Sequence, residues 1–347
     1  NNVAIGYLAL GNNTTAAGNS AVGYKALEDC TTGHSNVASG PYSLSNVTTG
    51  DKNTAVGFSA GARVTSENEF TAVGYYAGLY ATSGSNTFVG EASGKGVDGS
   101  STGASNTAIG RNTLFAFTTG ASNVAMGKDA GISVTSGSEN VYIGLKAGND
   151  GTTGNNNTAV GSNAGIGLTT GGNNTLLGND AGRSGSPGGE VNNDNHKICI
   201  GDENIDGAHI QVDWTVASDQ RDKTDFTALD LGLNFVKALA PVTYKWDKRS
   251  KYGDKSADDY DLNAQSPDGT HKEDWLDIGF KAQEVKALEE AAGYTTAAKK
   301  NLTVSTSGDG KQMGLQYSKF VPILVKAIQE QNALIEALTA RVTTLEG

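Results

Sequence analysis

The chain has little of several residue types that characterise common protein classes. Its 347 residues contain only two cysteines, Cys30 and Cys199, which lie far apart and form neither a disulfide framework nor a zinc motif. There are five prolines, and the glycines follow no strict three-residue period, which excludes a collagen-like triple helix. No apolar run approaches the length of about 18 residues that a membrane-spanning helix requires. We therefore expect a protein that does not span a membrane.

Positive charge is also scarce. The chain carries 26 Lys and Arg against 37 Asp and Glu, a net charge of −11, which argues against nucleic acid or an anionic membrane as its main partner. Residues 1–217 hold only 9 of the basic and 17 of the acidic residues, but 38 of the 47 glycines. The composition therefore predicts that two differently built regions meet near residue 215.

A short phrase recurs through the first region. It reads N-[TV]-A-[VI]-G in its most regular form, as at Asn53–Gly57 and Asn106–Gly110. The closing glycines lie at positions 6, 23, 40, 57, 74, 90, 110, 127, 144, 161, 178 and 201. Most intervals are 17 residues, and such a fixed period predicts a repeat architecture. The longer intervals after Gly90 and Gly178 are the candidate positions for receptor-binding loops.

Each repeat combines a short run of Thr, Val, Ile and Ala with a glycine and a polar turn. A unit of 17 residues is too short for two packed helices, and glycine at this density disfavours helix. We therefore predict that residues 1–201 form a β-solenoid with one repeat per coil. Few large apolar residues are available per coil, so we expect several chains to associate about a common axis.

The phrase N-[TV]-A-[VI]-G-x-x-A resembles the head repeats of trimeric autotransporter adhesins and related repeats of phage tail fibres. The resemblance covers residues 1–201, although the 17-residue unit is longer than the one expected of adhesin heads. It implies that this region is the shaft of a homotrimer.

The second region, residues 218–347, has the pattern of a smaller α/β domain. Asp225 is placed to cap a helix that ends before Pro241, and Val242–Trp246 alternates like a strand. A polar stretch from residue 247 to 274 indicates a long loop or a flexible excursion. Two further helices are predicted: a short one over Gln283–Ala292, and a final one that begins at Ser318.

The final helix has a heptad pattern. Its apolar positions are Val321, Leu324, Ile328, Ile335, Leu338, Val342 and Leu345, with Gln331 at the one polar core position. For the first turns, an amphipathic helix that packs on its own domain remains an alternative. For the last three turns we expect a coiled coil, because little else in the chain is available to cover them.

Several blocks of this region closely resemble the intramolecular chaperone domain at the C-termini of phage endosialidases, tailspikes and L-shaped tail fibres. The matching residues are Ser218–Lys223 (SDQRDK), Leu239–Trp246 (LAPVTYKW), Ile278–Val285 (IGFKAQEV), Tyr317–Ser318 and Ala327–Glu330 (AIQE). The resemblance implies a chaperone domain over residues 218–347, joined to the shaft by a neck over residues 202–217.

In that family the domain drives trimerisation of the stalk and then removes itself by autocleavage. The resemblance implies that Ser218 is the nucleophile, that Lys223 is its base, and that the cut falls at or next to Ala217–Ser218. A serine hydroxyl needs a neighbouring base, and lysine serves as one only where desolvation favours its neutral form. Residues five apart do not meet on a strand or a helix, so a turn or a partner chain must bring the two together.

Two weaker signals suggest metal ligands. Asp202–Gly207 fits the first half of a calcium-binding loop, with Asp213 at the twelfth position, but that position normally holds Glu and no helices flank the loop. His196 and Cys199 have the spacing of metal ligands but lack further candidates. We favour a turn in the neck and predict neither a metal nor a cofactor.

Aromatic residues follow the motif glycine in several early repeats, at Tyr7, Tyr24, Phe58 and Tyr75. Packing between coils is the favoured explanation, and a sugar-binding row is the alternative.

Together these features predict the distal part of a homotrimeric fibre on a virion tail or a cell surface, which recognises a glycan or surface protein of a host or target cell. Its only predicted enzyme activity is one self-cleavage per chain. A surface adhesin that keeps its C-terminal domain as a tip, or a glycan-degrading tailspike, would be the alternatives. The tailspike is disfavoured because residues before 218 show no paired carboxylates in a cleft-like context.

Overall fold

The computed structural model describes residues 1–211, 214–255, 257, 259–298, 300 and 302–347. The chain divides into two compact units, Asn1–Asn204 and Ile205–Gly347. Within the described residues, no helix is both long and apolar enough to cross a membrane.

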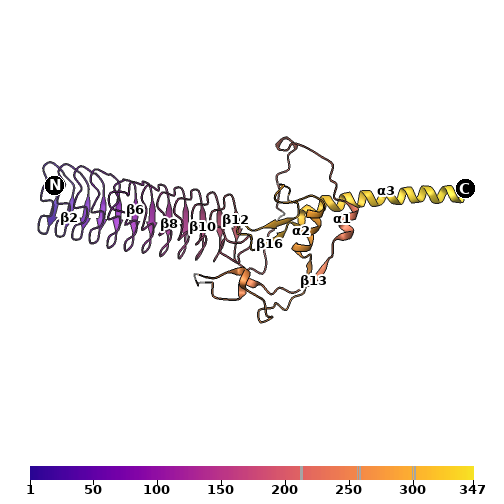
Figure 1. Cartoon of the computed structure of the whole chain (residues 1–347). Helices are drawn as coiled ribbons and strands as arrows, with labels where there is room; N and C mark the ends of the chain where they lie inside the picture. The colour runs from indigo at the N-terminus through magenta and orange to yellow at the C-terminus, as the bar shows by residue number, and fades with distance from the viewer. Residues whose placement is uncertain (212–213, 256, 258, 299, 301) are drawn as a thin grey trace. The chain divides into compact units, whose positions relative to one another are not determined.

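The first unit is a single stack of parallel strands, shown in Figure 1 as arrows placed one beside the next. The strands are β1 (Val3–Ile5), β2 (Ser20–Val22), β3 (Val37–Ser39), β4 (Thr54–Val56), β5 (Thr71–Val73), β6 (Thr87–Val89), β7 (Thr107–Ile109), β8 (Val124–Met126), β9 (Val141–Ile143), β10 (Thr158–Val160), β11 (Thr175–Leu177) and β12 (Ile198–Ile200). They pair in chain order, with each repeat in register with the next, as in Ala55 opposite Ala72. The predicted β-solenoid is confirmed.

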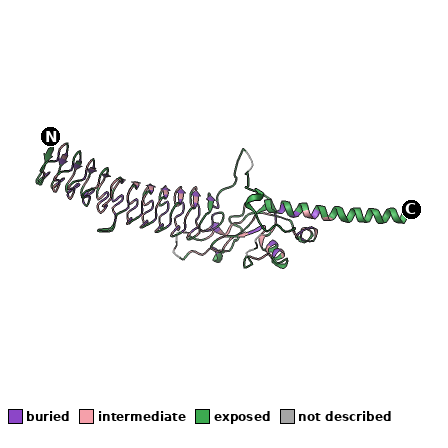
Figure 2. Cartoon of the chain, turned by 90° about the horizontal axis from the view of Figure 1, so that it is seen from above, coloured by how far each residue is buried: buried purple, intermediate pink, exposed green. Residues whose placement is uncertain are grey.

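The core of the solenoid is narrow. The middle residue of each strand points inward and is usually alanine, as at Ala55 and Ala125, which are fully buried. Larger residues such as Phe88 and Tyr142 replace alanine in some coils. Figure 2 shows that buried residues recur from coil to coil along the solenoid. Because neighbouring strands lie about 4.8 Å apart, even small side chains stack closely in such a core.

The asparagine that begins most of the repeat phrases joins one coil to the next, and Phe70 and Lys197 stand in its place in two coils. The backbone N–H of Asn140 donates to Oδ1 of Asn123 at 3.0 Å, and its side-chain amide donates to the carbonyl of Gly154 at 2.8 Å. The Asn140 Oδ1 in turn accepts the backbone N–H of Asn157 at 2.9 Å. These asparagines are buried, so their amides satisfy backbone groups that water cannot reach.

The glycine that ends each phrase allows a close approach of the backbone at the corner of the coil. Gly127 has φ of +121°, a conformation that L-residues rarely adopt. A Cβ at this position would lie only 2.5 Å from the carbonyl oxygen of Gly144 in the next coil. Both the conformation and the lack of space therefore require glycine.

The second unit is a small α/β region. Its helices are α1 (Leu233–Ala238), α2 (Ala282–Ala291) and the 27-residue α3 (Phe320–Glu346). Its strands form two antiparallel pairs, β13 (Val242–Tyr244) with β14 (Asp277–Gly279), and β15 (Val304–Thr306) with β16 (Met313–Leu315). Short 3-10 helices cover Gln220–Asp222, Arg249–Lys251, Leu262–Ala264 and Tyr317–Lys319. The predicted α/β region that ends in a long helix is confirmed.

The predicted helix start at Asp225 is wrong. Asp225 has φ of +55°, outside the helical range, and α1 begins only at Leu233. Its first backbone N–H, that of Leu233, donates to Oε2 of Glu330 on α3 at 2.8 Å. A residue far along the chain, rather than a local capping side chain, therefore accepts the free backbone N–H at the start of this helix.

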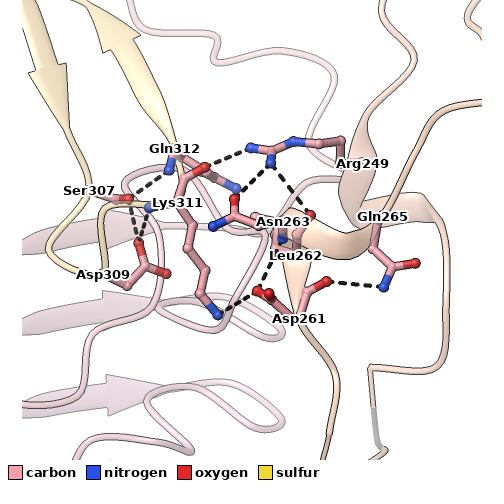
Figure 3. Close-up of polar contacts among 9 residues, drawn as sticks. All are labelled: Arg249, Asp261, Leu262, Asn263, Gln265, Ser307, Asp309, Lys311 and Gln312. Carbon is pink, nitrogen blue, oxygen red and sulfur yellow. Dashed lines mark hydrogen bonds and ion pairs between the residues drawn. The ribbon is translucent and has the colours of Figure 1, made fainter.

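In the polar stretch over residues 247–274, the described residues form a loop with short 3-10 turns that is anchored to the tip of the β15–β16 hairpin (Figure 3). The Arg249 guanidinium donates to the carbonyl of Lys311 at 2.6 Å and to Oδ1 of Asn263 at 3.0 Å. The Lys311 ammonium lies 3.0 Å from the Asp261 carboxylate, and this contact lowers the pKa of Asp261. Leu262, between these polar contacts, is buried. The loop prediction is confirmed, and the anchoring hairpin was not predicted.

Candidate self-cleavage site and assembly surfaces

Ser218 and Lys223 lie together at the start of the second unit. The Lys223 Nζ is 2.6 Å from the Ser218 Oγ and 3.3 Å from the Ser218 carbonyl oxygen. The 3-10 helix Gln220–Asp222 lies between them and reverses the chain, which supplies the turn that the five-residue spacing requires. The geometry therefore places an amine within reach of the serine hydroxyl.

Asp219 stabilises this turn. Its Oδ1 accepts the backbone N–H of Arg221 at 2.9 Å, and the Arg221 guanidinium donates to both of its carboxylate oxygens. The hydrogen bonds from Arg221 lower the pKa of Asp219, so the carboxylate stays charged under mildly acidic conditions. Sequence reasoning did not identify Asp219 and Arg221 as a structural pair, although both lie within the matched block Ser218–Lys223.

In the single chain this site is exposed to solvent. Ser218, Lys223 and the preceding Ala217 are all exposed, and the side chains of Trp214 and Val216 are 75% and 78% exposed. Removal of water from a lysine amine favours its neutral form, which is the form that can accept a proton. The two groups are thus positioned for the reaction, but among the described residues of the single chain none shields them from water.

The metal-binding candidates take part in ordinary polar contacts. Oδ1 of Asp202 accepts the backbone N–H of Asn204 at 2.8 Å, as expected of a turn, and Asp213 lies outside the described residues. His196 Nδ1 lies 2.9 Å from the Asn173 amide, and burial raises the pKa of the Cys199 thiol. Over the described ranges, His, Cys, Asp and Glu form no group of three that could hold a metal ion.

The α3 helix has two different faces. Phe320, Ile323 and Ala327 are buried in the core of the second unit. The apolar heptad positions are instead exposed, between 43% and 84%, and we call them the α3 seam: Val321, Leu324, Ile328, Ile335, Leu338, Val342 and Leu345. The first turns therefore pack on their own domain through other residues than those of the heptad, while the seam stays open along the helix.

The solenoid also presents an apolar row to solvent. The third residue of each strand points away from the core, and it is Val, Ile, Met or Leu in every strand but β3, where it is Ser39. We call these residues the sheet-face row. Several are well exposed, including Ile5 at 61%, Val56 at 40% and Ile200 at 55%. The row extends from β1 to β12 with one polar interruption at Ser39, so it offers an extended surface for association.

Comparison with known proteins identifies part of the second unit. Residues 218–294 match the model of the family described as chaperone of endosialidase, whose members are autoproteolytic chaperone domains. The match begins at Ser218. No curated protein and no solved structure shows significant similarity to the chain. The β-solenoid and this family match together support the resemblance to a fibre with a C-terminal chaperone.

Proposed function

We propose that this chain is the distal part of a homotrimeric fibre, on a virion tail or an extracellular surface, that recognises a host or target cell. The shaft is residues 1–201, the neck residues 202–217, and residues 218–347 are a chaperone that assembles the trimer and then cuts itself off. The observation that carries this proposal is the 2.6 Å contact between Lys223 Nζ and Ser218 Oγ, at the first residue of the family match.

The cut requires only groups of this chain and one water molecule. Neutral Lys223 accepts the proton of the Ser218 hydroxyl, and the Ser218 Oγ attacks the carbonyl carbon of Ala217. The bond from that carbon to the Ser218 nitrogen breaks, and the nitrogen takes the proton from Lys223 as it becomes a free amine. Water then hydrolyses the resulting ester, which yields the Ala217 carboxylate and restores the hydroxyl of Ser218.

Assembly is the step that would make Lys223 a base. The amine is solvated in one chain, and packing of further copies around the neck would exclude water from it. Cleavage would therefore report correct assembly and occur once per chain. Loss of the chaperone would make folding hard to reverse, so the released shaft would be kinetically stable.

The exposed surfaces supply the contacts that a trimer needs. The α3 seam has β-branched Val321, Ile328, Ile335 and Val342 at one set of core positions and leucine at most of the other. By itself this pattern favours two strands in a parallel coiled coil. The third copy must therefore be specified elsewhere, and the sheet-face row is the surface that extends along the shaft.

The test is an intact-mass spectrum and a denaturing gel of freshly expressed wild type, Ser218→Ala and Lys223→Ala. We expect wild type to give fragments that end at Ala217 and start at Ser218, and both variants to stay uncut. Lys245→Ala is the matched control, since Lys245 is also exposed in the second unit, and it should be cut like wild type. Cleavage of Ser218→Ala would refute the proposed nucleophile. An uncut wild type would favour the adhesin with a permanent tip.

A further inference from the structure

Aromatic side chains form a continuous row along one corner of the solenoid. We call Tyr7, Tyr24, Tyr42, Phe58 and Tyr75 the aromatic ladder. Their ring centroids lie 5.5, 5.2, 5.9 and 5.5 Å apart in succession. The rings pack on one another from coil to coil, yet each remains between 37% and 67% exposed.

The fold itself does not require aromatic residues at this corner. In the later coils the residue that follows the motif glycine is Glu91, Arg111, Lys128, Leu145, Ser162 or Asn179. The backbone there keeps the same strand pairing and the same positive φ at the glycine. Since charged and small polar residues support an equivalent coil, the exposed rings of the first five coils point to a role other than folding.

The aromatic ladder also differs in extent from the sheet-face row. That row is apolar in every strand from β1 to β12 except β3, as expected of an association surface that extends along the shaft. The aromatic ladder ends at Tyr75, after which the same corner becomes charged at Glu91 and Arg111, whose side chains form an ion pair at 3.6 Å. A surface confined to five coils is therefore unsuited to pairing shafts along their length.

The size and chemistry of the aromatic ladder suit a thin, linear ligand. Its exposed area is on the order of 500 Å², given about 200 Å² for a whole aromatic side chain. A stable protein interface buries about 800 Å² on each partner. The tyrosines add a row of hydroxyls. Tyr42 is turned by 72° and 75° from its neighbours Tyr24 and Phe58, so one crosswise ring separates two stacked pairs of rings.

We propose that the aromatic ladder binds a linear glycan, whose sugar units offer apolar C–H faces and hydroxyls in a regular repeat along the same direction. A polymer that repeats along its length matches a protein surface that repeats once per coil. The inference rests on the recognition role proposed above and assigns the ligand class and the site to that role.

The test compares the full chain with a triple variant, Tyr24→Ser, Phe58→Ser and Tyr75→Ser. Serine is the natural residue at the equivalent position of a later coil, Ser162, so the coils should still form. The control is Leu145→Ser, which removes an exposed apolar side chain from the same position outside the aromatic ladder. The probe is an array of immobilised oligosaccharides built from hexose, N-acetylhexosamine and sialic acid repeats, followed by titration with the oligosaccharide that binds.

We expect wild type and Leu145→Ser to bind at least one oligosaccharide series with affinity that increases with chain length, and the triple variant to bind at least tenfold more weakly. No binding by wild type, or equal binding by the triple variant, would overturn the inference. So would loss of the trimer in the triple variant by light scattering, since the aromatic ladder would then be a contact between copies. Cleavage at Ala217–Ser218, measured on the same samples, tests the proposed function separately.

Discussion

The two units of this chain differ in how completely a single copy buries its apolar side chains and pairs its buried polar groups. In the solenoid, buried asparagines and corner glycines bind each coil to the next, and the core is closed within the chain. In the second unit, large apolar side chains stay in water, among them Trp275 at 84% and the whole α3 seam. The comparison indicates that coil stacking is a property of one chain, whereas the second unit leaves apolar side chains exposed that the proposed assembly would cover.

The largest effect should come from a substitution that blocks association of chains through the α3 seam. Leu338→Asp places a carboxylate in the middle of the α3 seam, where three copies would have to bury it. We expect loss of the trimer by light scattering and at least a tenfold loss of cleavage. Ala340→Asp adds the same charge on the opposite side of the helix and should change neither. A Leu338→Asp chain that is still cut at the wild-type rate would show that the seam does not support cleavage.

The next largest effect should come from the corner of a coil. Gly127→Ala introduces a Cβ against the Gly144 carbonyl, and the strained backbone alone costs about 1–3 kcal/mol. We expect a marked drop in the thermal unfolding temperature of the shaft. Gly99→Ala is the matched control, because Gly99 has φ of +71° but no atom within 4 Å of the added Cβ. If the two variants lose equal stability, close approach between coils is not the reason for glycine.

Asn140→Ala should have a smaller but clear effect on the same unit. It leaves the Asn157 N–H and the Gly154 carbonyl buried without these hydrogen bonds, at a cost of about 3 kcal/mol. The loss in the free energy of unfolding is measured by denaturant unfolding of the shaft. Asn179→Ala changes an exposed asparagine and should alter stability by less than about 0.5 kcal/mol. Equal losses of stability in the two variants would show that the hydrogen bonds of Asn140 between coils do not stabilise the shaft.

The smallest effect should be a pH dependence in the second unit. The backbone N–H of Leu233 lowers the pKa of Glu330, so the charged carboxylate contributes stability above the pKa of an unfolded glutamate. That contribution is lost as the pH falls through the lowered value in the folded state. In Glu330→Gln the free energy of unfolding should therefore fall less steeply as the pH is lowered into the acid range. Glu336→Gln should leave this pH dependence unchanged. If the free energy of unfolding depends on pH in the same way in wild type and Glu330→Gln, the Glu330 carboxylate does not stabilise the second unit.

Local repetition made the solenoid predictable, because each coil repeats the same phrase and bonds mainly to its neighbours. The reason for its asparagines was not evident until Asn140 was seen to bridge three coils. In the second unit, contacts between residues far apart in the sequence limited what could be predicted. The start of α1 depends on Glu330, about a hundred residues later, and the three-residue strands β15 and β16 give too weak a pattern to predict. The roles of Ser218 and Lys223 came from family resemblance, since spacing alone gave no reason to pair them.

The central claim is that assembly activates self-cleavage, and its most direct test is the rate of cleavage against chain concentration. Unfolded wild-type chain is refolded at a series of dilutions, and the fragment that ends at Ala217 is followed by mass spectrometry together with the trimer. If assembly activates the reaction, cleavage slows steeply on dilution and fragments appear only after the trimer. A cleavage rate that is the same at every concentration would show that a single chain cuts itself without assembly.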